Sequence, residues 1–494
     1  MSERTTTKKK IAILGGGMAA LTAAFELTQT AELRDAHEVT VYQMGWRLGG
    51  KGASGRNPRH ADRIEEHGLH ILMGFYHNTF RLLRACYAEL GRAPGTPLAT
   101  LEEAVKPHGF IVVTEQVSGR WEPWELPFPP LPGLPGEGEG EAPSPLDYLK
   151  KLLAWANGVF TASLETRCIA PDLALDVCDV EREIDAPAAA DGQGYRGLEA
   201  QGADRRSRIE GFVHDLYEGQ GRGLVPSAVS LHLAHLLAEN DLFDPGPLVW
   251  LLRRFSAWMS GAITPHVATS TALRRLWIAL ELGITTVIGA VEDGVAAAPD
   301  GWFSLDDEDL RAWLARHGAS AMACDSAIVR AVYEAAFTGP GQAAAGTAIQ
   351  GALRLCFTYK QAIFQKMQAG MGDTIFAPLY LVLRRRGVRF EFFHRVDELV
   401  LSPDRRRIAA VKMGRQAETK AGKYDPLYDV LGLPCWPSSP KFADLEGGPA
   451  LEASGQNLES WWNTWPDVAP RQLLLGEDFD AVILGIAVGG LPEV

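Results

Sequence analysis

The sequence predicts an α/β protein in which one chain of 494 residues builds two domains: a domain with a parallel sheet, and a mainly helical domain inserted into it. Three observations support this. A short apolar run at residues 11–14 leads through three glycines into good helix formers, which indicates a strand, a tight turn and a helix. A continuous apolar run at residues 481–486 is typical of a buried parallel strand. Between them, residues 211–365 are mainly helical in pattern.

The glycine turn at residues 15–17 fits a dinucleotide-binding fingerprint, G-x-G-x-x-A, with Ala20 in the last place. Gly15 allows the sharp turn, Gly17 lets a pyrophosphate approach the backbone, and Ala20 lets the helix lie close to the strand. The free N–H groups at the start of that helix favour an anion. We therefore predict a Rossmann-like domain with these cofactor-binding residues: Gly15, Gly16, Gly17, Met18, Ala19 and Ala20.

A second apolar strand, residues 39–42, ends at Gln43, where a ribose-binding acid is expected. A carboxylate accepts hydrogen bonds from both ribose hydroxyls, whereas an amide accepts with one oxygen and donates with its nitrogen. We expect Gln43 to face the ribose of an adenosine and to bind it more loosely than an acid would.

The residues that follow carry two cations around a pair of glycines: Arg47, then Gly49 and Gly50, then Lys51. A pyrophosphate needs both positive charge and close approach to the backbone, and this pattern supplies the two together. These four residues are therefore predicted to bind the cofactor.

Two segments resemble a known superfamily. Residues 41–51, VYQMGWRLGGK, are similar to the segment of the flavin-containing amine oxidases and carotenoid (phytoene) desaturases that reads acid, variable residues, Arg-x-Gly-Gly and Arg or Lys. Residues 65–76, EEHGLHILMGFY, are similar to the H/N-G-x-H segment of plant-type phytoene desaturases. The nearest likeness is to a poorly characterised bacterial branch described as NAD-binding or FAD-dependent oxidoreductases. The likeness is good over the first ninety residues, moderate over residues 367–413 and the last fifteen, and loose in between.

The resemblance implies FAD as the bound nucleotide, with the inserted helical domain as the substrate domain. It implies hydride transfer between the flavin and an apolar, isoprenoid or lipid-like substrate, in a desaturation or isomerisation. An amine or amino-acid oxidase is a second interpretation. A third, from another class, is a non-catalytic nucleotide-binding subunit or incomplete fragment, because Gln43 replaces the acid.

The resemblance also assigns roles to residues outside the glycine motifs. His67, Gly68 and the backbone of Val396 are implied to lie at the cofactor, and His70 near the flavin as the candidate catalytic residue. For both histidines, ordinary hydrogen bonding in a loop is the alternative. No third ligand lies at metal-site spacing from them, so we expect no metal.

Composition argues against several other classes. A formal charge of −13 argues against a nucleic-acid partner, which would favour a basic surface. The six cysteines contain no C-x-x-C pair and indicate neither a disulfide framework nor an iron–sulfur set: Cys86, Cys168, Cys178, Cys324, Cys356 and Cys435. We expect a cytoplasmic location, with peripheral contact with the inner face of a membrane as an alternative. No window reaches the roughly 20 uninterrupted apolar residues of a membrane span.

Several connections can be predicted from local composition. Residues 53–63 are polar and are expected to form a surface connection. Asn78 is expected to cap a helix that runs to residue 90 and ends at Gly91. Residues 122–145, rich in Pro, Gly and Glu, are expected to form a long surface loop rather than a binding lid.

In the helical domain, Ser304 or Asp306 is expected to cap a helix, so the acids at residues 306–309 mark a helix start rather than a metal or acid–base site. Residues 186–208 are low in apolar content and are expected to form a mobile excursion. The apolar helices are expected to form an ordinary core, with an apolar cavity or a membrane-facing surface as alternatives.

The return of the chain to the sheet domain is predicted as a helix at residues 376–385, a strand at residues 388–393, and a hairpin of residues 396–401 with 408–412. Residues 416–465 are expected to be loop-rich, with four tryptophans as packing anchors: Trp436, Trp461, Trp462 and Trp465.

The expected domain boundaries are as follows: residues 1–95 and 366–415 for the two parts of the FAD-binding domain, 96–365 for the helical substrate domain, 416–478 for the loop-rich segment, and 479–494 for the terminal strand. In the resembled family, a late FAD-binding segment follows such a strand. We therefore expect a truncated chain, or a second chain that supplies the remainder, and weak FAD binding by this chain alone.

Overall fold

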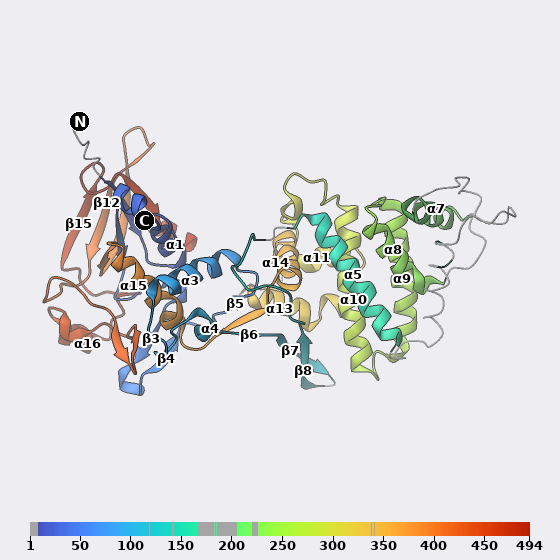
Figure 1. Ribbon diagram of the computed structural model, residues 1–494, viewed down its shortest axis with the longest axis horizontal. Helices are drawn as coiled ribbons and strands as arrows, with labels where there is room; N and C mark the ends of the chain where they lie inside the picture. The colour runs from blue at the N-terminus through green and yellow to red at the C-terminus, as the bar shows by residue number, and fades with distance from the viewer. Residues whose placement is uncertain are drawn as a thin grey trace. The chain divides into compact units, whose positions relative to one another are not determined.

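A computed structural model describes residues 8–494, except 118, 141–142, 166–181, 183, 185–204, 220–225, 337 and 340. The chain forms two compact units (Figure 1). Unit 1 comprises residues 1–109, 129–140 and 360–494, and unit 2 comprises residues 110–128 and 141–359. The predicted α/β fold class, with a Rossmann-like domain and a mainly helical insertion, is confirmed. Cys168, Cys178 and most of the expected excursion, residues 186–204, lie outside the described residues.

Unit 1 is built on a parallel sheet of four strands in the order β10-β2-β1-β16. The strands are Arg389–Phe392, His37–Gln43, Lys9–Leu14 and Ala481–Leu484, in that order. The central strands β1 and β2 are largely buried. The terminal strand β16 is parallel, as predicted, but it is half-buried rather than buried because it occupies an edge of the sheet.

Three helices pack together beside this sheet: α1 (Met18–Glu26), α3 (His77–Leu90) and α15 (Ala377–Arg385) (Figure 1). They bury apolar side chains in the same core as the sheet. The end of α3 at Gly91 is confirmed, with a left-handed φ of 59° that glycine adopts without strain. The predicted cap at Asn78 is wrong, because the helix already begins at His77 and has no side-chain cap.

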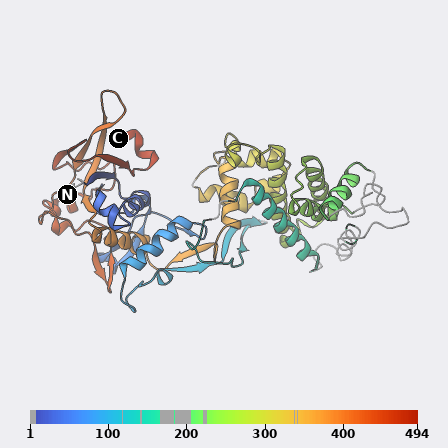
Figure 2. The ribbon, with the colours of Figure 1, turned by 45° about the horizontal axis from the view of Figure 1, so that its top comes forward.

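A three-stranded antiparallel sheet lies next to the end of β2 in unit 1. Its strands are β11 (His394–Leu401), β12 (Ile408–Arg415) and β15 (Ala469–Leu474). The hairpin of the first two strands was predicted, and its tip projects as an orange loop in Figure 2. The third strand was not predicted. It pairs along β12 from Ala410 to Arg415.

Smaller elements complete unit 1. Residues 53–63 do not form an irregular connection as expected, because most of them join a hairpin of β3 (Ser54–Asn57) with β4 (Arg63–Glu66). The remaining strands and helices are β5 (Leu72–Met73), β6 (Val105–His108), β9 (Phe364–Met367), β13 (Tyr428–Val430), β14 (Leu433–Cys435), α2 (Ala31–Ala36), α4 (Leu101–Ala104) and α16 (Gly448–Ser454).

The tryptophans of the loop-rich segment differ in burial. Trp436 is fully buried, and Trp461 and Trp465 are half-buried. Trp462 does not pack as expected, since it is 86% exposed. The four described cysteines are free thiols: Cys86, Cys324, Cys356 and Cys435.

Unit 2 begins with a hairpin that the sequence did not indicate. β7 (Phe110–Val117) pairs with β8 (Arg120–Pro127), so the first part of the expected loop at residues 122–145 is a strand. Trp124 is buried against Ile278, because alternate side chains of a strand point to the same face. Proline is tolerated in this stretch because both strands of a two-stranded hairpin are edge strands, so a missing backbone N–H need not interrupt a central strand.

The rest of unit 2 is helical, as predicted. The helices are α5 (Pro145–Glu165), α7 (Arg205–Tyr217), α8 (Ser230–Glu239), α9 (Pro245–Ile263), α10 (Thr271–Glu292), α11 (Leu310–Arg316), α12 (Ala321–Cys324), α13 (Ala327–Ala335) and α14 (Ala345–Phe357). Helix α7 takes in residues 205–208, which were expected to belong to a mobile excursion.

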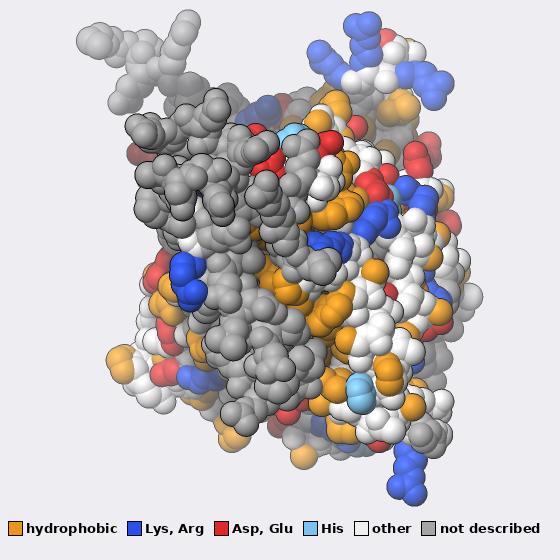
Figure 3. Space-filling model, turned by 90° about the vertical axis from the view of Figure 1, so that its right-hand side faces the viewer, with side chains coloured by type: hydrophobic (Ala, Val, Ile, Leu, Met, Phe, Trp, Pro, Cys, Tyr) orange, Lys and Arg blue, Asp and Glu red, His pale blue; other side chains and the backbone are white. Residues whose placement is uncertain are grey.

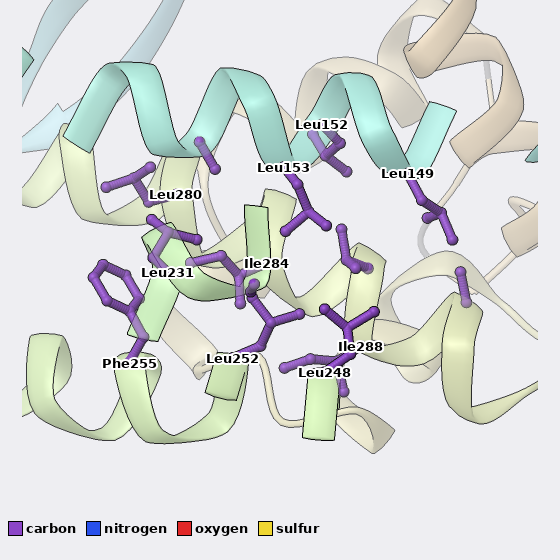
Figure 4. Close-up of a cluster of buried hydrophobic side chains, with 14 of the residues drawn as sticks. Leu149, Leu152, Leu153, Leu231, Leu248, Leu252, Phe255, Leu280, Ile284 and Ile288 are labelled. Atoms are coloured by element: carbon purple, nitrogen blue, oxygen red, sulfur yellow. The ribbon is translucent and has the colours of Figure 1, made fainter. Parts of the chain in front are cut away.

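The helices of unit 2 share one apolar core (Figure 4). Leu153 of α5, Leu252 of α9 and Ile284 of α10 point toward one another in this core. On the face shown in Figure 3, apolar side chains are interspersed with polar and charged ones. Within the part of the chain that the structure describes, no helix has both the length and the apolar character needed to cross a membrane.

The acidic run at residues 306–309 starts a helix, as predicted, but the capping residue is neither Ser304 nor Asp306. Asp309 caps α11, because its carboxylate accepts a hydrogen bond from the backbone N–H of Arg311 at 3.1 Å. The carboxylate of Asp306 instead accepts from the backbone N–H and hydroxyl of Thr347 at 2.7 and 2.8 Å.

The end of α10 carries a charged network around Asp293. Burial by itself raises the pKa of this carboxyl, but hydrogen bonds from three side chains outweigh burial and lower the pKa from 3.8 to about 2. The donors are Arg316, Trp313 and His317, at 2.9, 2.8 and 3.0 Å. The pKa is lower in the folded state, so the carboxylate stabilises unit 2 above the ordinary pKa and loses this effect as the pH falls toward 2.

We expect acid to weaken the wild-type protein more steeply than an Asp293→Asn variant between about pH 4 and pH 2. The amide keeps the shape of the side chain but does not titrate there. The measurement is the urea midpoint of unfolding as a function of pH for both proteins. Parallel pH profiles would contradict this assignment.

Candidate nucleotide-binding site

The glycine turn after β1 has the geometry that its motif predicts. Gly15 has a left-handed φ of 100°, and its N–H donates to the carbonyl oxygen of Tyr42 at 2.8 Å. A Cβ on Gly15 would lie 2.9 Å from the carbonyl oxygen of Gly485, so a larger residue would both strain the turn and collide with backbone. The turn therefore joins three strands of the sheet, β1, β2 and β16.

Gly17 provides an open position at the start of α1. It is the N-cap residue, its helix has no side-chain cap, and a Cβ placed on it would meet no atom within 4 Å. A phosphate at this position would meet free N–H groups and the positive end of the helix dipole. The residues thus fit a pyrophosphate, because space and donors are present where the fingerprint requires them.

The second glycine pair lies directly against the first turn. The N–H of Gly49 donates to the carbonyl oxygen of Gly16 at 2.8 Å, and Gly17 and Gly49 form an isolated parallel bridge. A Cβ on Gly50 would lie 3.4 Å from the Cα of Gly17. The structure therefore brings the two predicted motifs together into one backbone surface.

Ala20 marks the close contact between α1 and the edge strand. A Cβ added to Gly485, just after β16, would lie 2.7 Å from the Cβ of Ala20. Two small residues facing each other let the helix approach the sheet, as predicted for Ala20. Met18 is half-buried and Ala19 is exposed at the start of the same helix.

A π-helix, Gly372–Phe376, supports the second glycine pair. A Cβ on Gly49 would lie 3.0 Å from the ring of Phe376. The π-helix is held in turn by Asp373, which is 2% exposed and forms an ion pair with Arg56 at 2.8 Å. π-helical turns occur often at functional sites.

Gln43 lies at the end of β2, beside the glycine turn. Its Nε2 donates to the carbonyl oxygen of Met44 at 2.6 Å, and its Oε1 would lie 2.6 Å from a Cβ on Gly16. The side chain is therefore folded back on its own backbone, against the turn. Its contact with a ribose stays a prediction.

The two predicted cations differ in their surroundings. The Arg47 guanidinium makes three hydrogen bonds of 2.8 to 3.0 Å with the Glu459 carboxylate and lies over the Trp46 ring at 5.3 Å. Lys51 is exposed, and its ammonium group has no partner among the residues that the structure describes. Of these two cations, only Lys51 thus has an unpaired charge within the described part of the chain, while the charge of Arg47 is already neutralised by Glu459.

The two histidines lie in the loop between β4 and β5. His67 is exposed, and its Nε2 is 3.5 Å from Nη2 of Arg47. His70 has its Nδ1 3.0 Å from the Glu66 carboxylate and its Nε2 3.1 Å from the carbonyl oxygen of Lys51. Both ring nitrogens thus face acceptors, which links His70 to the second glycine motif. Its catalytic role stays a prediction.

The other two residues that the resemblance implied have different environments. Val396 is 7% exposed and belongs to the apolar cluster that includes Leu14 and Tyr42, next to the glycine turn. The pairing register of β11 shifts just after Val396, and such bulges are common next to active sites. A Cβ on Gly68 would meet nothing within 4 Å.

Sequence reasoning missed three residues of this site: Gln416, Glu459 and Gly485. Gln416 is 1% exposed. Its side chain hydrogen-bonds to the backbone of Gly45 and of Leu458, so it connects Gly45 with the segment that contains Glu459. Residues this far apart in the chain leave no local pattern. Only Gly485 had a usable signal, because it follows the apolar run of the terminal strand.

No group of three or more His, Cys, Asp or Glu side chains in the described parts of the chain could hold a metal ion.

This geometry defines unit 1 as a Rossmann-like nucleotide-binding domain, and residues 13–86 match the NAD(P)-binding Rossmann-like domain family. The chain is also similar to the chloroplastic/chromoplastic zeta-carotene desaturases. It is 42% identical to the enzyme of Solanum lycopersicum and 40% identical to those of Capsicum annuum and Arabidopsis thaliana, over 82 residues. The match covers 17% of this chain and spans only 13% of the length of these relatives. The predicted resemblance to carotenoid desaturases is confirmed over this segment.

Proposed function

We propose that this chain is an FAD-dependent oxidoreductase that acts on an apolar, isoprenoid or lipid-like substrate by desaturation or isomerisation. The observation that carries the proposal is the open position at Gly17, which is the N-cap residue at the start of α1. Gly50 of the second glycine motif lies beside it. The similarity to zeta-carotene desaturases over the same segment supports a flavin and an isoprenoid substrate.

In this proposal, each part of the site has a separate task. The start of α1 and Lys51 hold the pyrophosphate, and the segment containing Gln43 receives the adenosine. Bound flavin supplies hydride transfer. His70, held by Glu66 and the carbonyl oxygen of Lys51, is the proposed catalytic residue beside the flavin. The proposed binding partner is an apolar small-molecule substrate and not a nucleic acid. Unit 2 is the proposed substrate domain.

The visible spectrum of the purified protein, recorded after incubation with FAD and gel filtration, tests the proposal. We expect the absorption of oxidised flavin to co-elute with the chain, and FAD to be released on denaturation. If the reaction is a desaturation, anaerobic addition of an apolar polyene should bleach the flavin, because two electrons pass to it; a redox-neutral isomerisation should convert the polyene and leave the flavin oxidised. Bleaching only by an amine would favour the amine oxidase alternative. Binding of ADP without any flavin would contradict the proposal and favour a non-catalytic nucleotide-binding protein.

The second candidate, a non-catalytic nucleotide-binding subunit, is favoured by one observation. Neither Gln43 nor Arg47 offers a free charge to the cofactor, since the first is an amide and the second is paired with Glu459. A second chain that supplies further contacts would strengthen the binding of FAD. Titration of FAD against the chain alone measures how much binding the single chain provides.

A further inference from the structure

A carboxylate from a distant part of the chain lies at the end of β2, where the fingerprint acid is missing. Gly45 follows Gln43 by two residues, and a Cβ placed on Gly45 would lie 2.5 Å from the Cγ of Glu459. The side chain of Glu459 therefore lies directly against the backbone that leaves β2. In a Rossmann-like domain, this strand end is where the ribose of the adenosine is bound.

The position of Glu459 is fixed from several directions. Its carboxylate receives the three hydrogen bonds from Arg47, and its own N–H donates to Oδ1 of Asn457 at 2.9 Å. Gln416 accepts from the N–H of Gly45 at 2.9 Å and donates to the carbonyl oxygen of the preceding residue, Leu458, at 2.8 Å. A carboxylate held in this way is preorganised to accept further hydrogen bonds.

Glu459 has more acceptor capacity than Gln43, whose amide has a single, uncharged acceptor oxygen. An ionised carboxylate offers about four lone-pair positions, and Arg47 uses only part of them. The Glu459 side chain is 14% exposed, so it can be reached from solvent. The Gln43 amide nitrogen is a donor and is already bound to Met44.

We propose that Glu459 is the ribose-binding acid of this site, in place of the residue at position 43. It accepts hydrogen bonds from the 2′ and 3′ hydroxyls of an adenine nucleotide, and Arg47 acts as a positioning residue that holds Glu459 rather than as a pyrophosphate ligand. The proposal rests on the proposed function in one respect, since it requires the site to bind an adenine nucleotide.

The test compares ADP with 2′,3′-dideoxy-ADP, which lacks both hydroxyls, by calorimetric titration of the full chain. We expect the wild-type chain to prefer ADP by at least about tenfold, because hydrogen bonds to a charged acceptor are strong. In Glu459→Gln the preference should fall to about threefold or less, because an amide has one acceptor oxygen instead of two and carries no charge. The matched control is Glu89→Gln, which changes a carboxylate that also accepts three hydrogen bonds from one arginine, Arg386, away from the glycine turn; it should keep the wild-type preference.

The ratio of the two dissociation constants separates ribose binding from a structural role. If Glu459 only supports the fold, both nucleotides weaken together and the ratio stays at its wild-type value, which would overturn the proposal. Loss of the preference in Glu89→Gln would overturn it as well, because the effect would then not be specific to Glu459. The double variant Arg47→Met/Glu459→Met leaves no buried charge unpaired and should show no preference for ADP. If the wild-type chain binds neither nucleotide, the proposed function itself is wrong.

Discussion

A Gly17→Val chain is expected to fold normally and to lose its nucleotide, with an affinity at least about a hundredfold lower than wild type. The φ of −76° at Gly17 is one that valine adopts, and a Cβ there meets no protein atom within 4 Å. The valine side chain would instead occupy the space into which the start of α1 directs its free N–H groups. Loss of two hydrogen bonds to a charged phosphate accounts for this effect.

FAD titration monitored by flavin fluorescence measures the affinity, and thermal unfolding checks the fold. The matched control is Gly351→Val on α14 in unit 2, where a Cβ also meets nothing within 4 Å. This control should keep the wild-type affinity. A folded Gly17→Val protein that binds FAD as tightly as wild type would remove the basis for placing the pyrophosphate at this turn.

Gly346→Ala is expected to destabilise unit 2 by about 3 kcal/mol, since overpacking of a buried contact costs this much. Gly346 lies in the first turn of α14, and its Cβ would fall 1.8 Å from the carbonyl oxygen of Trp302 and 2.9 Å from Oδ1 of Asp306. The first contact is with backbone, and Trp302 is 1% exposed, so the neighbour cannot turn aside as a flexible side chain would. The measurement is the free energy of unfolding in urea.

Gly351, on the same helix, provides a control for which we expect the opposite change in stability. At Gly351 the added Cβ is in open space, so Gly351→Ala should stabilise the protein by about 0.5–1 kcal/mol through helix propensity. A Gly346→Ala protein as stable as Gly351→Ala would show that α14 does not lie against the backbone of Trp302.

The parts of the site that could be predicted are those encoded within short stretches of sequence. The strand, turn and helix of residues 9–26 follow from the order of apolar residues, glycines and helix formers, and Gly15 has the positive φ that its motif requires. The contact of Gly49 with Gly16 could also be expected, because the second glycine motif follows the first by only 33 residues.

The parts that could not be predicted depend on distant partners. The charge of Arg47 suggested a pyrophosphate ligand, but Glu459, 412 residues away, takes up its hydrogen bonds. The hairpin of β7 with β8 was hidden by Pro and Glu residues, although Trp124 is buried on one of its faces. The cap of α11 was placed too early because several acids offer the same cap, and only the fold selects Asp309.

The pairing of β1 with β16 also governs the order in which this molecule can fold. The N–H of Lys10 bonds to the carboxylate of Asp480, which is 470 residues away, so β16 cannot close this edge of the parallel sheet until residues 480–484 have been synthesised. Contacts this distant in sequence form slowly, because the entropy of closing a long loop must be overcome first. Unit 2 consists of residues up to 359, so it can assemble before the ribosome has added β16, the edge partner of β1. During that interval the glycine turn lacks Gly485, and the protein has no finished place for a nucleotide.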